Sequence, residues 1–242
     1  MLNNRELMME CEHLEGKVQS VQSTKDDDIN GVSLHRVVVS KEVAREISKP
    51  QGSYSTLLFN ENIGASLKAR TKEELAEYIK GKDISKVLLI GVGNENIKSD
   101  SFGVLCSKFT SKRTQNLENL MIFIPSVSGL TNIDSKLLCE LVIKCIKPTL
   151  VIVCDSLLTN NIDRLNRSLQ ISDASFVIEV EHESISFGYT TMIKSTAISQ
   201  DVSREVKLSM SENDVYIEEV SQMVADVICD VLGGAQDGCF DK

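Results

Sequence analysis

The sequence predicts an α/β protein: a three-layer α/β/α sandwich built around a mainly parallel sheet. Short and nearly continuous apolar runs are typical of strands that are covered on both faces, as they are in a parallel sheet. These runs occupy residues 87–90, 121–124, 150–154 and 176–180. Because helices are expected between them, the chain repeats a β-α-β pattern, which favours this fold class.

Two strands and two helices are expected before this regular part. Residues 35–40 and 54–59 have the β-branched and aromatic content of strands, and residues 40–48 between them are expected to form a short helix. The capping-box pattern Thr-Lys-Glu-Glu then predicts that a helix spans residues 71–78 and stops at Gly81.

Three further helices are indicated by apolar residues at intervals of three and four. Their apolar stripes lie within residues 102–109, 137–145 and 220–231. The second of these helices is expected to end at the Lys-Pro pair of residues 147–148, and the third at the glycines of residues 233–234.

The organisation that follows is a polar N-terminal arm (1–30), a single α/β domain (31–234) and a frayed tail (235–242). A chain of 242 residues with 42% hydrophobic content can bury one substantial core. No apolar run approaches the roughly 18 residues that a membrane-spanning helix needs, and the first residues lack the core of a signal peptide. We therefore expect a cytoplasmic protein with no membrane contact.

Charge and cysteine content restrict the partners. The formal net charge is −9, and the clustered basic residues that bind phosphates are missing, which disfavours a nucleic-acid partner. The seven cysteines form no CxxC pair. This pattern is typical of reduced, partly buried thiols, and it argues against disulfides and a cysteine metal site.

Two aspartates follow predicted strands and are the best candidates for chemistry. In an open parallel sheet, ligands bind beyond the carboxyl ends of the strands. This rule selects the loop of residues 91–100, which ends in Asp100, and residues 155–158, which begin with Asp155. Two carboxylates near one cleft can divide the work of hydrolysis, because one keeps a proton while the other stays ionised and activates water.

Each aspartate also has a purely structural explanation. Asp100 precedes an expected helix and would serve as its N-cap, and Asp155 would be a solvated residue at the end of its strand. Gly91 and Gly93 would let the chain turn sharply after the preceding strand. Asn96 stands where a dinucleotide-binding motif has its third glycine, which disfavours a nucleotide ligand.

A metal site is another use of the two carboxylates. His182 would then be the third ligand beside Asp100 and Asp155. Because His182 follows a predicted strand, a surface position is the simpler explanation of this histidine.

Three segments resemble the germination protease family, the endopeptidases of spore-forming bacteria that degrade small acid-soluble spore proteins. They are VVVSKEVAREISKPQGSYSTL (37–57), VLLIGVGNENIKSDSFG (87–103) and the stretch of residues 129–173. The last segment is similar to the family's helix, Ile-Lys-Pro turn, strand ending in aspartate, and RxN and QI-D patterns, in that order.

The resemblance implies a fold like that of the hydrogenase maturation peptidases and an aspartate-dependent endopeptidase without a cofactor or metal ion. It places the proposed catalytic pair on Asp100 and Asp155. The residues that we expect to contact the substrate are Gly91, Gly93, Asn94, Asn166 and Asp173. The implied substrates are small acid-soluble spore proteins in the cytoplasm of the forespore or the spore core. The resemblance also implies a homo-oligomer and a zymogen whose propeptide lies within residues 1–30.

Two departures from the family pattern keep alternatives open. Ser99 stands where a proline precedes the first aspartate, and residues 174–191 stand where the family has a glycine-rich segment with histidine. The chain is therefore either an active endopeptidase or a binding or regulatory paralogue without activity. A metal-dependent maturation-type peptidase that uses Asp100, Asp155 and His182 is the third alternative.

Overall fold

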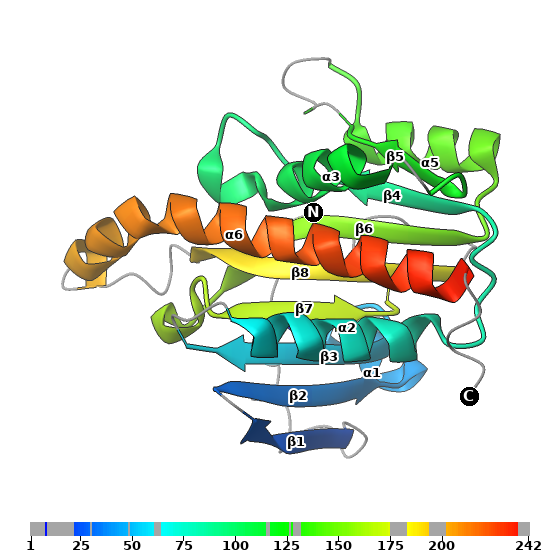
Figure 1. The fold of residues 1–242 in the computed structure, drawn as a ribbon. Helices are drawn as coiled ribbons and strands as arrows, with labels where there is room; N and C mark the ends of the chain where they lie inside the picture. The colour runs from blue at the N-terminus through cyan, green and yellow to red at the C-terminus, as the bar shows by residue number, and fades with distance from the viewer. Residues whose placement is uncertain are drawn as a thin grey trace.

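A central sheet organises the molecule (Figure 1). The computed structural model describes residue 8 and residues 22–29, 31–47, 49–60, 64–114, 117–125, 127, 132–174, 183–193 and 202–236. Within these residues the sheet has eight strands, which lie side by side in the order β1, β2, β3, β7, β8, β6, β4, β5.

The sheet has an antiparallel part and a parallel part, which meet where β7 pairs antiparallel with β8. The antiparallel strands are β1 (Gln22–Ile29), β2 (Val32–Val39), β3 (Gly52–Phe59) and β7 (Ser168–Ser172). The parallel strands are β8 (Glu183–Ile193), β6 (Leu150–Thr159), β4 (Val87–Gly91) and β5 (Leu120–Phe123). Two short 3₁₀ helices are η3 (Lys98–Asp100) and η5 (Ile162–Arg164).

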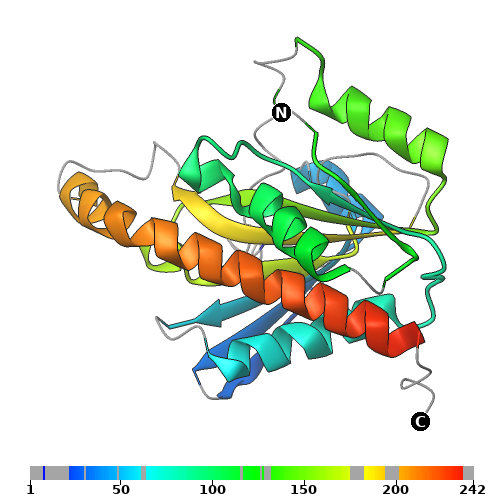
Figure 2. The same cartoon turned by 45° about the horizontal axis from the view of Figure 1, so that its top comes forward.

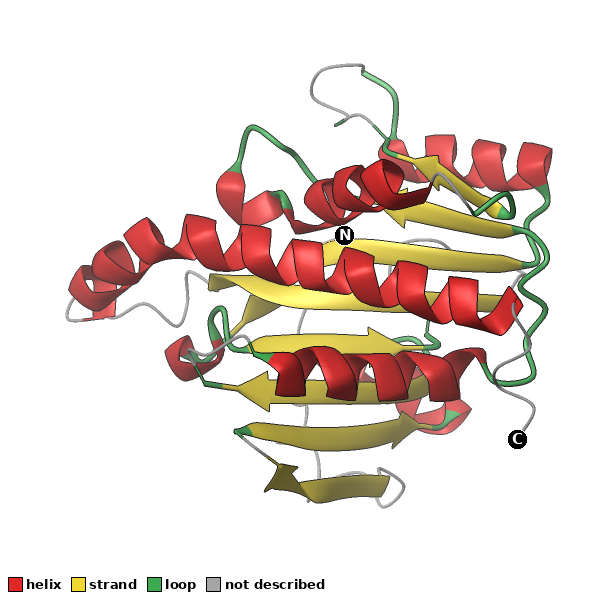
Figure 3. Cartoon of the chain, viewed as in Figure 1, coloured by secondary structure: helices red, strands yellow, loops and turns green. Residues whose placement is uncertain are grey.

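Helices cover both faces of the sheet, which makes three layers. On the face turned to the viewer in Figure 1 lie α2 (Ala65–Ile79), α3 (Phe102–Arg113) and α6 (Val202–Gln236). On the opposite face lie α1 (Lys41–Ile47) and α5 (Ser135–Ile146), as the tilted view of Figure 2 also shows. Figure 3 shows the same layers by type of structure. The predicted three-layer α/β sandwich is confirmed.

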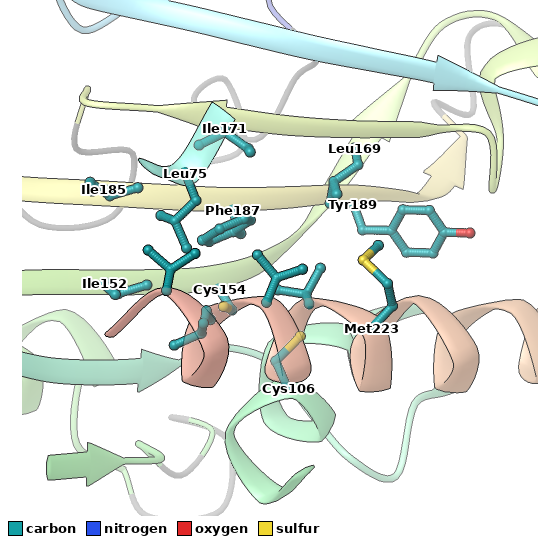
Figure 4. Packing of buried hydrophobic residues seen from close by; sticks show 14 of the residues in the cluster. Leu75, Cys106, Ile152, Cys154, Leu169, Ile171, Ile185, Phe187, Tyr189 and Met223 are labelled. Atoms are coloured by element: carbon teal, nitrogen blue, oxygen red, sulfur yellow. The ribbon is translucent and has the colours of Figure 1, made fainter. Parts of the chain in front are cut away.

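Alternate residues of the central strands enter two hydrophobic clusters, one under each helical layer. In β6, Ile152 and Cys154 belong to the cluster under α3 and α6, whereas Val151 and Val153 belong to the cluster under α5. Figure 4 shows part of the first cluster, to which Met223 of α6 and Tyr189 of β8 both belong. Each fully buried aliphatic side chain contributes about 1.5–3 kcal/mol, so burial on both faces explains the continuous apolar runs of the sequence.

The helix predicted for residues 71–78 is longer than expected and has no capping box. It is α2, which begins at Ala65 after the N-cap Gly64. Thr71 is fully buried inside it and donates its hydroxyl to the carbonyl oxygen of Leu67, four residues earlier, at 2.7 Å. The local pattern was misleading because a buried threonine inside a helix can make this bond as readily as a threonine at its start.

Several other boundaries differ from the sequence-based expectation. Residues 22–29, placed in the polar arm, form β1 and pair with β2. Strands β7 and β8 were not predicted, and the strand expected at residues 176–180 lies outside the described residues. Helix α6 begins at residue 202 and continues past Gly233 to residue 236. The division into arm, domain and tail stays a prediction.

The length of α6 depends on its packing. Val224, Val227, Ile228 and Val231 are fully buried against the sheet and the neighbouring helices. A glycine inside a helix costs only about 1 kcal/mol, and the packing of these side chains offsets that cost. Within the described part of the chain, no helix combines the length and the apolar character that crossing a bilayer requires.

Candidate active site

Asp155 lies inside β6, one position beyond the level at which β4 ends. Cys154 pairs with Gly91, the last residue of β4, whereas Asp155 pairs with Gly188 of β8 on the other side. Because β8 continues beside it, β6 runs on to Thr159. The expectation that Asp155 ends its own strand was therefore wrong. Its position next to the carboxyl end of β4 is nevertheless the kind of place at which parallel sheets bind ligands.

The side chain of Asp155 is buried, with 4% of its surface exposed. Val153 belongs to the cluster under α5, and the alternation along a strand directs Asp155 to that same face. One carboxylate oxygen, Oδ1, accepts a hydrogen bond from the N–H of Ser156 at 2.8 Å. The explanation of Asp155 as a solvated strand-end residue was wrong. Burial of a carboxylate is costly, so a functional explanation gains weight.

Asp100 is the last residue of η3, at the same end of the parallel strands. Its carbonyl oxygen accepts a hydrogen bond from the N–H of Asn94 at 2.8 Å, which closes the loop after β4. The hydroxyl of Thr191 in β8 donates to the carbonyl oxygen of Ser99 at 2.5 Å. Since η3 also contacts β6, these interactions hold Asp100 beside the strand that carries Asp155.

The N-cap of α3 is Ser101, not Asp100. The Ser101 hydroxyl donates to the carbonyl oxygen of Lys98 at 2.7 Å, and the Ser101 side chain makes no capping hydrogen bond to the first turn of α3. The structural explanation of Asp100 as an N-cap was therefore wrong.

Three glycines let α3 and the loop before it approach the strands closely. A Cβ atom at Gly93 would lie 2.0 Å from the carbonyl oxygen of Asp100. A Cβ atom at Gly91 would lie 2.3 Å from the carbonyl oxygen of Gly103, and one at Gly103 would lie 2.1 Å from that of Cys154. Gly91 thus packs β4 against α3. Gly103 was missed, although a glycine in the first turn of an apolar helix is a signal of close packing.

The two candidate asparagines lie in the loops at this end of the sheet. Asn94 is half-buried, and its side-chain oxygen accepts a hydrogen bond from the N–H of Asn96 at 3.0 Å. Asn166 has a left-handed backbone (φ 58°) and donates its N–H to the carbonyl oxygen of Thr190 at 2.8 Å. Its own carbonyl oxygen accepts the hydroxyl of Tyr189 at 2.9 Å. Asn166 is therefore fixed next to the part of β8 that holds η3.

Asp173 does not lie with the other candidates. Asp155 is level with Gly188, which is level with Gln170, and Asp173 lies three residues after Gln170, just past the end of β7. Because β7 runs antiparallel to β6 through β8, those residues lead away from the carboxyl ends of the parallel strands. The Asp173 carboxylate accepts a hydrogen bond from the N–H of Ser53 at 2.6 Å. Asp173 therefore closes the β3–β7 ladder.

Gln170 is a polar residue near Asp155 that sequence reasoning missed. It is fully buried on the same face of the sheet, and its Oε1 accepts a hydrogen bond from the N–H of Met8 at 2.8 Å. The signal was present: Gln170 stands between Leu169 and Ile171 on a strand. Only the pairing of β7 with β8 brings it level with Asp155.

The described residues contain no group of three or more His, Cys, Asp and Glu side chains placed to hold a metal ion. His182 lies outside those residues, so the metal-dependent alternative stays a prediction.

The fold and the two aspartates define an α/β protein with a candidate hydrolytic site at the carboxyl ends of its parallel strands. The model of peptidase family A25, described as germination protease, matches residues 1–178. The chain belongs to the germination protease family, which is a family of proteases.

Individual relatives agree with this assignment. The chain is 30% identical over 169 residues to the germination protease of Bacillus subtilis (strain 168), with 62% of this chain and 46% of that protein covered. It is 25% identical over 240 residues to the germination protease of Caldanaerobacter subterraneus subsp. tengcongensis, with 83% and 73% covered. The chain spans about half the length of the Bacillus subtilis relative.

A solved structure that is similar to this chain is the NiFe hydrogenase maturation protease HycI from Thermococcus kodakarensis KOD1. The TM-score is 0.41 at 14% sequence identity, and the match covers 66% of this chain and 99% of the other.

Proposed function

We propose that the chain is an endopeptidase that hydrolyses small acid-soluble spore proteins with Asp155 and Asp100. The observation that carries this proposal is the burial of Asp155 beside the end of β4, at the end of the sheet where η3 holds Asp100. Membership in the germination protease family supports a peptide substrate.

The proposed mechanism divides acid and base work between the two carboxyl groups. The ionised group takes a proton from water while the water oxygen attacks the peptide carbonyl carbon. The protonated group then gives its proton to the amide nitrogen, and the C–N bond breaks to leave a carboxylic acid and an amine. The burial of Asp155 favours this division, because two carboxylates that share one cleft resist carrying two negative charges.

The loops at the carboxyl end of the sheet would shape the cleft. In this proposal, Gly93 and Asn94 fix the position of η3, and Asn166 presents a buried side-chain amide next to β8. Gly91 acts indirectly by letting α3 pack on β4, and Asp173 has no part in the chemistry.

The remaining features of the proposal follow the family. The substrates would be met in the cytoplasm of the forespore or the spore core, the active form would be a homo-oligomer, and residues 1–30 would include a propeptide. No cofactor takes part in the scheme.

The test is incubation of the purified full chain with a small acid-soluble spore protein, followed by mass spectrometry of the fragments. We expect defined fragments from the wild type and a loss of at least about 1,000-fold in kcat/KM for Asp155→Asn and Asp100→Asn, since an essential acid or base is removed. Asp163→Asn is the matched control, because Asp163 is exposed in η5 near the same loops. Full cleavage by the two site variants would contradict the proposal.

Intact substrate with the wild type as well would instead favour the paralogue that binds without cleaving. The metal-dependent alternative predicts one tightly bound metal ion per chain in the purified protein, lost on His182→Ala. Elemental analysis of the same preparations checks that prediction.

A further inference from the structure

A buried row of polar residues crosses the sheet at the level of Asp155. The register runs from Asp155 in β6 through Gly188 in β8 and Gln170 in β7 to Thr56 in β3. The three residues in this row that have side chains are at most 4% exposed. Because paired residues of neighbouring strands point to the same side of a sheet, these side chains share the face of α1 and α5.

Gln170, in this row, has hydrogen-bonding capacity that the described residues leave unused. It is fully buried, and its Oε1 accepts the main-chain N–H of Met8 at 2.8 Å. Its Nε2 is buried too and has no hydrogen-bond partner among the described residues. A buried amide donor without a partner lowers the free energy of unfolding by about 1–3 kcal/mol. The presence of a glutamine at position 170 therefore calls for an explanation.

We propose that Gln170 positions the substrate by binding the main chain of the peptide on one side of the scissile bond, an inference that rests on the proposed peptidase function. A side-chain carboxamide offers one acceptor oxygen and two N–H donors, and a peptide group offers one donor and one acceptor. Both hydrogen bonds between the Gln170 carboxamide and this peptide group involve only the main chain of the substrate. Gln170 therefore binds the peptide independently of the substrate's side chains. The contact with Met8 shows that a main-chain N–H fits this place.

The register sets the distance over which Gln170 acts. One strand, β8, separates it from Asp155. Two inter-strand spacings of about 4.8 Å put the two Cα atoms roughly 10 Å apart. An extended peptide covers about 3.3 Å per residue, so Gln170 contacts the peptide about three residues from the bond that is cut. Gly188, the β8 residue between Asp155 and Gln170, has no side chain of its own. The side chain of Leu157, in β6, lies over Gly188 instead.

The first experiment compares steady-state cleavage of a small acid-soluble spore protein by the wild type and Gln170→Met, which keeps the size of the side chain and removes its polar atoms. We expect KM to rise about tenfold and kcat to stay within about twofold. The variant loses one or two hydrogen bonds that hold the substrate equally in the bound ground state and in the transition state. Ser55→Ala is the matched control. Ser55 is buried on the other face of β3, where its hydroxyl meets that of Tyr78. An unchanged KM for folded Gln170→Met would overturn the proposal.

Met8→Pro separates this role from a merely structural one. Proline removes the N–H that Met8 donates to Gln170 and leaves Gln170 in place. If Gln170 only holds Met8, the two variants raise KM alike, and the proposal is wrong. If Gln170 binds substrate, Met8→Pro leaves KM unchanged or lowers it, because the acceptor is no longer occupied. If Gln170→Met fails to fold, a raised KM for Met8→Pro still overturns the proposal.

Binding without turnover distinguishes failure of this inference from failure of the proposed function. Fluorescence anisotropy with the labelled spore protein gives Kd for Asp155→Asn and for Asp155→Asn combined with Gln170→Met. A Kd about tenfold weaker in the double variant supports Gln170 even if the wild type cleaves nothing. Equal Kd values would count against Gln170 whether or not the wild type is a peptidase, and no binding by either protein would contradict both this inference and the proposed substrate.

Discussion

At the scale of single residues, the absence of a side chain at Gly93 fixes the position of Asp100. Gly93 has φ +131°, which side chains rarely tolerate, and a Cβ atom there would lie 2.0 Å from the Asp100 carbonyl oxygen. That oxygen also accepts the N–H of Asn94. The loop can close on η3 only because residue 93 leaves this space empty.

Gly93→Ala should therefore cost much more stability than Gly81→Ala. Gly81 also has a positive φ (+75°), but a Cβ atom there would meet nothing within 4 Å. We expect Gly81→Ala to lower the free energy of unfolding by about 1 kcal/mol, the cost of the backbone conformation, and Gly93→Ala to lower it by at least about 2 kcal/mol more, because the loop must move. Urea unfolding followed by circular dichroism measures both. Equal losses would mean that the loop adapts without cost.

At the scale of elements, the site depends on how a short helix is attached to the sheet. The 3₁₀ helix η3 has no core of its own, since none of its residues is buried. Thr191 of β8 ties it to the sheet through the carbonyl oxygen of Ser99, and α3 follows it directly. Asp155, in contrast, lies in the long central strand β6, so its position is held more firmly than that of Asp100.

Thr191→Val should reduce activity more than its effect on stability would explain. The substitution keeps the shape of a residue that is 2% exposed and removes the bond to Ser99. We expect a loss of about 1 kcal/mol in the free energy of unfolding and a fall in kcat of about tenfold, because Asp100 is held less firmly. Thr110→Val is the control, since its hydroxyl bonds to Cys106 within α3. The idea fails if both variants lose activity equally.

At the scale of the whole molecule, the helical layers keep several thiols out of water. Burial raises the pKa of Cys139, in α5, to about 12 and that of Cys229, in α6, to about 11. The ordinary thiol pKa is 9.0. These cysteines lie on opposite faces of the sheet, so they report on the packing of both outer layers.

The free energy of unfolding should fall as the pH rises above about 9. Between pH 9.0 and about 11, the thiol of Cys229 is ionised in the unfolded chain and protonated in the folded chain, and for Cys139 this range extends to about 12. The folded state then binds more protons, so raising the pH favours unfolding. Urea unfolding at pH 8 and pH 10 measures the effect.

The controls for this pH dependence come from the same helices. Cys139→Ala and Cys229→Ala should each make the loss between pH 8 and pH 10 smaller. Cys145→Ala is the control, because Cys145 is exposed on α5. A pH dependence that is the same in all three variants would show that other groups cause it.

The local pattern of the sequence was enough to predict the strands near residues 87–90, 121–124 and 150–154, the helices between them, and Asp100 and Asp155 as the residues to examine. Strands that are buried on both faces must be apolar throughout, and the rule about the ends of parallel strands needs no coordinates. The same patterns also supported the resemblance to the germination protease family, which the match to residues 1–178 confirms.

Only the tertiary structure decided what depends on pairing between distant segments. The pairing of β8 with β6 puts Asp155 inside a strand, and the antiparallel course of β7 brings Gln170 level with Asp155 while it takes Asp173 away. Packing made Thr71 an interior residue of α2. The local sequence predicts helices and strands because it sets their propensity and their buried face. It does not determine which residues of two strands far apart in the chain pair with each other.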